Sequence, residues 1–190
     1  GAYTAFEVVA RNVPMGQHTL TVEVDNRFGE DSALHVVNDY YSYGGITRPV
    51  VLEQLPDVYI ARLYMTPVKT DMGWQAQVKA AVCNLTDREL SCQMTLSIDG
   101  LAQTTLPVEL SPDKGRAVSA TLDCPDAEPW QPLNPKLYTI TAQLEMDGQP
   151  VDDLIDRMGF RQVQVEGKDI LFNGEKLLLK GFNRHEDYGS

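Results

Sequence analysis

The sequence predicts an all-β protein whose central domain is an immunoglobulin-like β-sandwich. Apolar and polar residues alternate with a period of two along most of the chain, which is the pattern of half-buried strands, and no long helical stripe is present. Seven alternating segments follow one another between residues 56 and 165, and turn signals rich in Asp and Gly separate them. So many short strands and turns within about 105 residues is typical of two packed antiparallel sheets.

The seven strands expected in this sandwich begin soon after Pro56. By residue number they are 59–65, 75–83, 92–98, 103–109, 117–122, 138–145 and 158–165. The turn signals between them include Asp99-Gly100 and Asp147-Gly148, residue types that tolerate a positive φ. The Cys–Trp–Cys spacing of antibody domains is absent. The sandwich architecture is therefore predicted without membership of the immunoglobulin superfamily.

The segment before the sandwich, residues 1–55, is predicted to be the end of a larger β domain. Leu20, Val22 and Val24 alternate with polar residues, and short apolar runs follow at 34–37 and 50–52. These patterns indicate three or four strands, which are few for an independent hydrophobic core.

The segment after the sandwich, residues 164–190, begins with a hairpin signal. Asn173-Gly174 lies between two apolar runs, and both turn residues tolerate the positive φ of a two-residue hairpin loop. The second run includes Leu177–Leu179 and is unbroken, which suits a strand buried on both faces, as in a parallel barrel.

The three cysteines predict neither a disulfide framework nor a zinc site, because their number is odd and no Cys-x-x-Cys occurs. Cys83 and Cys92 would lie across a predicted hairpin. If the alternating apolar residues of both strands face the core, however, the two sulfurs fall on opposite faces of the sheet.

Composition and charge exclude several classes of function. The net charge of −11 argues against a surface that binds nucleic acid. No apolar run approaches the ~18 residues of a membrane helix, and no basic-then-apolar signal peptide is visible at the N-terminus.

Three stretches of sequence carry a resemblance to a known family. The first is N-D-Y-Y-S-Y-G-G-I-T-R-P-V at 38–50. The second is W-Q-P-L-N-P-K-L-Y at 130–138, followed by G-F-R at 159–161. The third is N-G-E-K at 173–176, which leads to G-F-N-R-H-E at 181–186. In this order and spacing they resemble glycoside hydrolase family 2, the β-galactosidase and β-glucuronidase family.

The resemblance implies a division into three parts. Residues 1–55 would be the C-terminal part of a sugar-binding jelly roll, residues 56–163 the immunoglobulin-like sandwich, and residues 164–190 the truncated start of a catalytic (β/α)8 barrel. Members of the family are retaining glycosidases with two glutamates about 5 Å apart, which lie on later barrel strands. The chain is therefore expected to be a non-catalytic fragment of a parent that hydrolyses a terminal β-linked sugar, of the β-galactoside or β-glucuronide type.

Two positions match residues that contact substrate in the family. Asp39 matches an acidic residue that the jelly roll projects into the active site to accept hydrogen bonds from sugar hydroxyls. His185 matches a histidine just past the first barrel strand that contacts the sugar near the bond being broken. A loop-capping aspartate and a surface histidine are the alternatives. Asn183, Arg184 and Glu186 are expected to support the site, with an ion pair between Arg184 and Glu186 as the alternative. Trp130 is expected to pack on the sandwich edge.

Further expectations concern ligands and partners. The resemblance implies a carbohydrate substrate and a homo-oligomeric parent, without nucleic-acid or membrane partners. No cofactor or metal site is expected in these residues, so any divalent metal would belong to the parent, and the compartment stays open between bacterial cytoplasm and periplasm. The alternative function is a stand-alone carbohydrate-binding or adhesive sandwich module. A purely structural immunoglobulin-like domain of a surface protein would account for residues 57–163 but for neither end.

Overall fold

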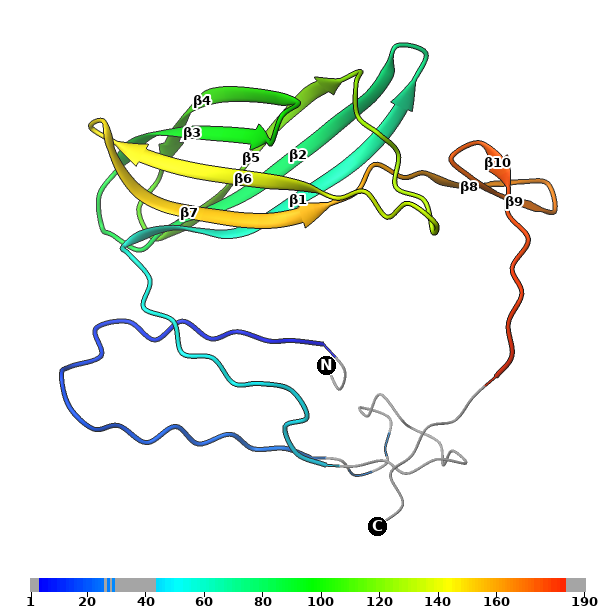
Figure 1. The fold of residues 1–190 in the computed structure, drawn as a ribbon. Helices are drawn as coiled ribbons and strands as arrows, with labels where there is room; N and C mark the ends of the chain where they lie inside the picture. The colour runs from blue at the N-terminus through cyan, green and yellow to red at the C-terminus, as the bar shows by residue number, and fades with distance from the viewer. Residues whose placement is uncertain (1–3, 26, 28, 30–43, 184–190) are drawn as a thin grey trace. The chain divides into compact units, whose positions relative to one another are not determined.

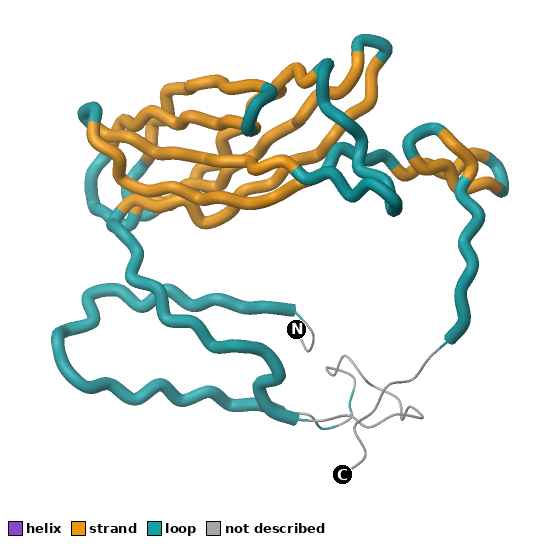
Figure 2. Tube along the Cα trace, viewed as in Figure 1, coloured by secondary structure: helices purple, strands orange, loops and turns teal. Residues whose placement is uncertain are grey.

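The computed structural model of the chain describes residues 4–25, 27, 29 and 44–183 (Figure 1). The chain divides into two units, one of residues 1–52 and 180–190 and the other of residues 53–179, and each is described by itself. The described residues of the first unit form neither strands nor helices, whereas the second unit consists of strands and turns (Figure 2).

Ten strands occur in the described part of the chain, and no helix. They are β1 (Val58–Thr70), β2 (Gly73–Asn84), β3 (Leu90–Ile98), β4 (Ala102–Leu110), β5 (Lys114–Cys124), β6 (Tyr138–Met146), β7 (Gln149–Met158), β8 (Val163–Glu166), β9 (Asp169–Phe172) and β10 (Glu175–Lys176). The predicted all-β class is confirmed. The first six predicted strands of the sandwich correspond to β1–β6, each of which is longer than predicted.

The strands β1–β7 form a sandwich of two antiparallel sheets. One sheet has the order β1-β2-β5 and the other β4-β3-β6-β7. At one edge the sheets are linked directly, because the backbone N–H of Ile60 in β1 donates to Asp152 Oδ2 in β7 over 2.7 Å.

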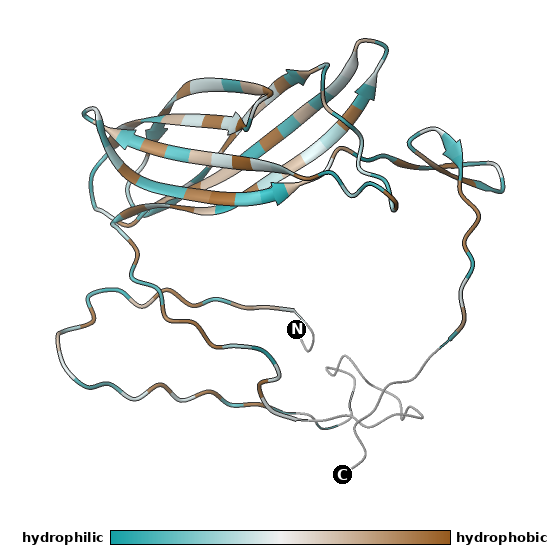
Figure 3. Cartoon of the chain, viewed as in Figure 1, coloured by the Kyte–Doolittle hydropathy of each residue, from teal (hydrophilic) through white to brown (hydrophobic). Residues whose placement is uncertain are grey.

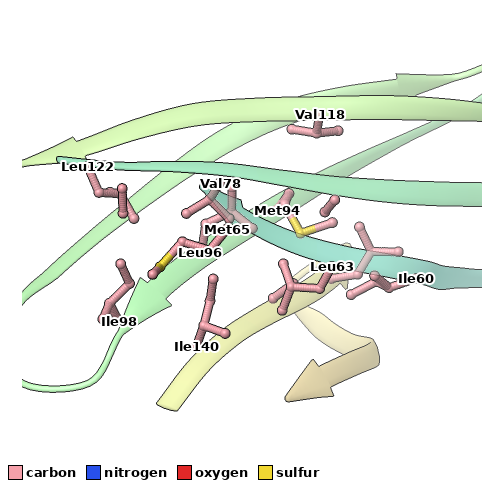
Figure 4. Close-up of a cluster of buried hydrophobic side chains, with 14 of the residues drawn as sticks. Ile60, Leu63, Met65, Val78, Met94, Leu96, Ile98, Val118, Leu122 and Ile140 are labelled. Atoms are coloured by element: carbon pink, nitrogen blue, oxygen red, sulfur yellow. The ribbon is translucent and has the colours of Figure 1, made fainter. Parts of the chain in front are cut away.

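The core lies between the two sheets and is built from alternate residues of the strands. Ala76, Val78, Ala80 and Val82 of β2 are at most 1% exposed, and their polar neighbours point outward. Figure 4 shows side chains of β1, β2 and β5 meeting those of β3 and β6. The resulting alternation of hydrophobic and hydrophilic residues is visible along each ribbon in Figure 3. Each large apolar side chain buried in this way contributes about 1.5–3 kcal/mol.

The last strand of the sandwich differs from the prediction. A strand was expected over 158–165, whereas β7 covers Gln149–Met158 and the ladder stops before β8 begins at Val163. The prediction missed β7 because Asp152, Asp153 and Asp156 interrupt its apolar pattern. An edge strand tolerates these acids, since its outer face meets water.

The pairing expected between β2 and β3 is also wrong. These strands belong to different sheets, so Cys83 and Cys92 do not lie across a hairpin; all three cysteines are free thiols. Asn84, which is 1% exposed, organises the crossing from one sheet to the other. Its Oδ1 accepts from the Thr86 N–H and hydroxyl, and its Nδ2 donates to the carbonyls of Arg88 and Ser111.

The strands expected in residues 1–55 do not appear among the described residues of that segment. Leu20 is 78% exposed and Leu52 is 99% exposed, and neither lies in a ladder. An alternating segment becomes a strand only when a partner satisfies its backbone groups, and the described residues offer none here. The run at 34–37 lies outside the described residues, and the jelly-roll assignment stays a prediction.

The hairpin predicted after the sandwich is confirmed. Asn173 and Gly174 have φ values of 52° and 89° and join β9 to β10 in a three-stranded sheet of order β10-β9-β8. The buried strand expected after the hairpin is not present. Residues 177–183 are irregular, and Leu178 is 74% exposed. Apart from the Leu177 N–H, which donates to the Ile170 carbonyl of β9, the backbone of this run pairs with no strand among the described residues.

Candidate functional site

Four of the five candidate site residues lie outside the described residues. These are Asp39, Arg184, His185 and Glu186. Asn183 is described; it is exposed and lies in the irregular segment 177–183. The structure therefore brings none of these residues together, and their roles stay predictions.

The part of the structure that leads into the candidate segment is a junction between the sandwich and the hairpin. We define the junction as residues 129–138, 159–162 and 172–173. The W-Q-P-L-N-P-K-L-Y and G-F-R motifs quoted above and the Asn of the Asn-Gly turn fall within it. Its geometry determines how the chain leaves the sandwich and enters the hairpin that precedes residues 177–183.

Phe160 anchors the junction in the sandwich. Its side chain is 0% exposed, and its ring centroid lies 5.8 Å from that of Trp74 and 5.5 Å from that of Tyr138. Its carbonyl accepts a hydrogen bond from the Trp130 N–H over 2.8 Å. Edge-to-face ring contacts of this kind add about 0.5–1.5 kcal/mol beyond area burial, so the end of β7 is held firmly against the core.

Gly159 allows the two chain segments of the junction to approach closely. A Cβ at this position would lie 2.9 Å from the Trp130 Cβ and 3.1 Å from the Lys136 carbonyl oxygen. Any larger residue would force the 130–138 segment away from the end of β7. Packing therefore explains the residue type at the first two positions of the G-F-R sequence, Gly159 and Phe160.

Trp130 joins the sandwich side of the junction to the hairpin. Its ring meets Phe172 edge-on at a centroid distance of 5.8 Å, and the Arg161 guanidinium lies 5.3 Å from the ring centroid. The expected packing on the sandwich edge is therefore only part of its role. The contact with Phe172 was not expected, because 42 positions of sequence separate the two residues.

Asn173 completes the junction with four hydrogen bonds. Its side-chain Oδ1 accepts from the Gln162 N–H over 2.9 Å, and its Nδ2 donates to the Trp130 carbonyl over 3.0 Å. Its backbone N–H donates to the Gln162 carbonyl over 2.8 Å, and its carbonyl accepts from Lys69 Nζ over 3.1 Å. Sequence reasoning identified this residue only as a turn former.

The described residues contain little that could carry out chemistry. Among them, no group of three or more His, Cys, Asp or Glu side chains is arranged to hold a metal ion. Burial raises the pKa of the Cys92 and Cys124 thiols, which makes them poor nucleophiles. The pKa of Asp25 is lowered to about 2 by its hydrogen bonds to Arg27, and this exposed pair is a local ion pair.

Two shallow hollows occur on the described surface of the sandwich. One is lined by residues that include Ser97, Asp99 and Thr139, and the other by residues that include Thr66 and Lys79. Neither has an aromatic lining residue or more than one carboxyl group, so neither resembles a pocket built to hold and cleave a sugar. No helix long and apolar enough to span a membrane is found in the part of the chain that the structure describes.

Comparison with known proteins relates this chain to one family. The family model described as glycosyl hydrolases family 2 matches residues 58–161. A crystal structure of a family 2 β-galacturonidase from Eisenbergiella tayi, bound to galacturonate, is 45% identical with a TM-score of 0.75 and covers 81% of this chain and 28% of that one.

Two curated relatives are likewise similar to this chain over most of its length and over a small part of their own. A β-glucuronidase from Paenibacillus borealis is 32% identical over 79% of this chain and 24% of its own length. A β-galactosidase from Streptococcus thermophilus is 27% identical over 78% of this chain and 14% of its own length. The chain thus spans a quarter or less of these curated relatives.

Proposed function

The chain belongs to glycosyl hydrolase family 2, and on that premise we propose that it is the scaffold section of an enzyme that hydrolyses a terminal β-linked sugar. The observation that carries the proposal is the 45% identity to a β-galacturonidase over 81% of this chain. The described residues contain a complete sandwich and an ordered hairpin, which suits a section that holds other parts of an enzyme in place.

Among the sugars open to the family, a uronic acid is favoured. Of the three relatives compared, the two with the higher identity to this chain are a β-galacturonidase and a β-glucuronidase. Both names refer to sugars that carry a carboxylate. The proposed substrate is therefore a terminal β-linked uronide, and a neutral β-galactoside is the second candidate because of the β-galactosidase relatives.

In this proposal the chemistry belongs to two glutamates outside these residues, which act as nucleophile and as acid/base. Asp39 would accept hydrogen bonds from sugar hydroxyls, since a carboxylate forms hydrogen bonds about twice as strong as a neutral acceptor does. His185 would contact the sugar from the first barrel strand, where barrel active sites gather. The sandwich would hold the two segments at a constant separation.

The test compares the product of the complete reading frame with the 190-residue chain. Both are assayed on aryl β-galacturonide, β-glucuronide and β-galactoside. We expect turnover only by the complete protein, with one of the uronides preferred. The proposal fails if the complete protein cleaves none of the three, or if the 190-residue chain has activity that disappears when one of its own residues is replaced. Sugar binding by the 190-residue chain, combined with an inactive complete protein, would support the stand-alone binding module instead.

A further inference from the structure

The hairpin of β8, β9 and β10 depends on the sandwich for its place. None of the residues in these three strands is buried, so the hairpin has no core of its own. Asn173 Nδ2 donates to the Trp130 carbonyl, and we call this hydrogen bond the tie. Beside it the Phe172 ring meets the Trp130 ring, and Lys69 Nζ donates to the Asn173 carbonyl. A segment without buried residues opens locally at a low cost in free energy.

Asn173 and Gly174 form the turn of this hairpin, and they are the one Asn-Gly pair in the sequence. Such a pair is prone to deamidation, because glycine has no side chain to shield its backbone nitrogen. The Gly174 nitrogen attacks Asn173 Cγ and gives up its proton to the departing side-chain nitrogen, which leaves as ammonia. Water then opens the cyclic imide to aspartate or to isoaspartate, in which the backbone runs through the side-chain carbons.

Two features of the folded structure oppose this reaction. The φ values of 52° at Asn173 and 89° at Gly174 are those of a type I′ turn. In this turn the Gly174 nitrogen lies on the far side of the Cα–C bond from the Asn173 Cβ. The carboxamide is also held at both ends, because Oδ1 accepts from the Gln162 N–H and Nδ2 makes the tie to Trp130. The Gly174 nitrogen therefore reaches Cγ only after the turn opens and the carboxamide is released.

We infer that Asn173-Gly174 is a deamidation site that the tie keeps closed in the folded chain. When the hairpin leaves the sandwich, the turn and the carboxamide are released together and the imide forms. Neither product restores the docked hairpin: a carboxylate lacks the donor that the Trp130 carbonyl accepts, and isoaspartate lengthens the backbone of a two-residue turn. The modification therefore marks chains whose hairpin has opened and prevents the hairpin from docking again. It is independent of the proposed hydrolysis.

The β6–β7 turn provides a matched comparison site. Asp147 and Gly148 have φ values of 51° and 72°, and Asp147 is exposed. Asp147→Asn places the same pair in a similar turn without the tie. The folded 190-residue variant is incubated at mildly alkaline pH, and its peptides are followed by mass spectrometry. We expect Asn173 to deamidate at least about tenfold more slowly than position 147 in the folded chain, and the two rates to agree within about twofold in guanidinium.

Two outcomes of this comparison would overturn the inference. Equal rates at the two positions in the folded chain would show that the tie adds no protection beyond that of the turn. A rate at Asn173 that is the same in the folded chain and in guanidinium would show that the site is not closed at all.

A second pair of variants loosens the hairpin without changing Asn173 or Gly174. Phe172→Ala removes the ring that meets Trp130. Val163→Ala shortens the cross-strand partner of Phe172, which is 61% exposed. Relative to the rate of the same variant in guanidinium, deamidation of Asn173 should be about threefold to tenfold faster in Phe172→Ala and unchanged in Val163→Ala. Equal effects of the two substitutions, or none from Phe172→Ala, would contradict control by docking on the sandwich.

Amide exchange tests whether the modification keeps the hairpin open. The Leu177 N–H donates to the Ile170 carbonyl across β9 and β10, so its protection reports the pairing that the turn closes. In the isoaspartate fraction separated from aged protein, this N–H should exchange about tenfold or more faster than in fresh protein. Equal protection in the two fractions would show that the modified hairpin closes again, and would overturn the irreversible part of the inference.

Discussion

At the scale of single residues, two asparagines hold separate segments of the chain together, a role that their positions in the sequence do not reveal. The side-chain amides of Asn84 and Asn173 each both donate and accept hydrogen bonds to groups of other residues. For Asn84 these groups lie at the crossing between the two sheets. For Asn173 they include the Trp130 carbonyl, which is distant in sequence. Among the described residues, Asn84 is the one buried polar or charged side chain. A buried amide with all its partners specifies one arrangement of the chain, since each lost partner leaves a costly unpaired group.

Replacing Asn84 should therefore destabilise the sandwich. We expect Asn84→Ala to lower the free energy of unfolding by about 1–3 kcal/mol, because the Ser111 carbonyl and the Thr86 N–H lose their Asn84 partner and the Arg88 carbonyl keeps only the Thr86 hydroxyl as donor. Chemical denaturation of the 190-residue chain measures the change. Thr121→Ala on the exposed face of β5 serves as control and should stay within about 0.5 kcal/mol; similar losses in both variants would contradict the assigned role.

The cysteines should differ in reactivity as their burial does. Burial raises the pKa of the Cys92 and Cys124 thiols, whereas Cys83 is half-buried on β2. At pH 8 iodoacetamide should modify Cys83 first, and the other two only after denaturation. Mass spectrometry of the native protein over time gives the order. Modification of Cys92 before Cys83 would show that the core opens far more readily than this packing allows.

The two candidate substrate contacts can be tested in the complete protein. Asp39→Asn preserves shape but replaces a charged acceptor, so kcat/KM should fall by about tenfold or more, since a hydrogen bond to a charged group is worth about 1.5–3 kcal/mol. His185→Ala should lower kcat as well as kcat/KM if the contact strengthens in the transition state. Steady-state kinetics with an unfolding curve for each variant provides the measurement. A change within about twofold in a folded Asp39→Asn variant would remove Asp39 from the site.

At the scale of elements, β7 shows why acidic residues do not exclude a strand. Asp152 on this edge strand accepts a hydrogen bond from the Ile60 N–H of β1 and so connects the two sheets. The register of β1 against β2 shifts just after Ile60, and the bulge leaves that N–H free to reach across. An aspartate in a sequence segment therefore does not exclude a strand, because its carboxylate can accept a hydrogen bond from a backbone N–H of a neighbouring edge strand.

The link at this edge can be measured by substitution. Asp152→Ala should lower the free energy of unfolding by about 1.5–3 kcal/mol, because it leaves the Ile60 N–H without its charged acceptor. Asp152→Asn keeps an acceptor oxygen and should cost less. The neighbouring Asp153 is exposed and points to the other face, so Asp153→Ala should have almost no effect in the same denaturation experiment. Equal effects at both aspartates would show that charge alone, rather than the bond, is responsible.

At the scale of the whole molecule, the second unit has a continuous core and the described residues of the first do not. Leu96, Ile98 and Ile140 are at most 2% exposed at the centre of the sandwich, whereas most of the large apolar residues described in 4–25 and 44–52 are exposed. Stability should therefore reside in the sandwich. This suits a section whose role is to hold other segments in place.

This difference predicts where stability is lost on substitution. Leu96→Ala should lower the free energy of unfolding by about 2–5 kcal/mol, since it leaves a cavity between the sheets. Leu20→Ala, at a position that is 78% exposed, should change it by less than about 0.5 kcal/mol. Amide exchange should likewise be slowest within residues 57–163. Faster exchange there than in residues 4–25 would contradict this distribution of stability.

The sequence by itself determined the all-β class, six of the seven sandwich strands and the Asn-Gly hairpin. Alternation along a strand and positive φ in a turn are properties of neighbouring residues, so they can be recognised locally. The family resemblance rested on three short stretches in order, and the family match over 58–161 confirms it.

Only the tertiary structure decided which strands share a sheet and which residues hold the parts together. β2 and β3 lie in different sheets, with Asn84 bonded to the segment between them, and β7 is a strand because it pairs with β6, while its Asp152 binds the Ile60 N–H of the other sheet. The tie between Asn173 and Trp130 joins residues 43 positions apart. Such contacts arise when distant backbone groups need partners in the folded chain, and no local pattern of residues specifies which partner each will find.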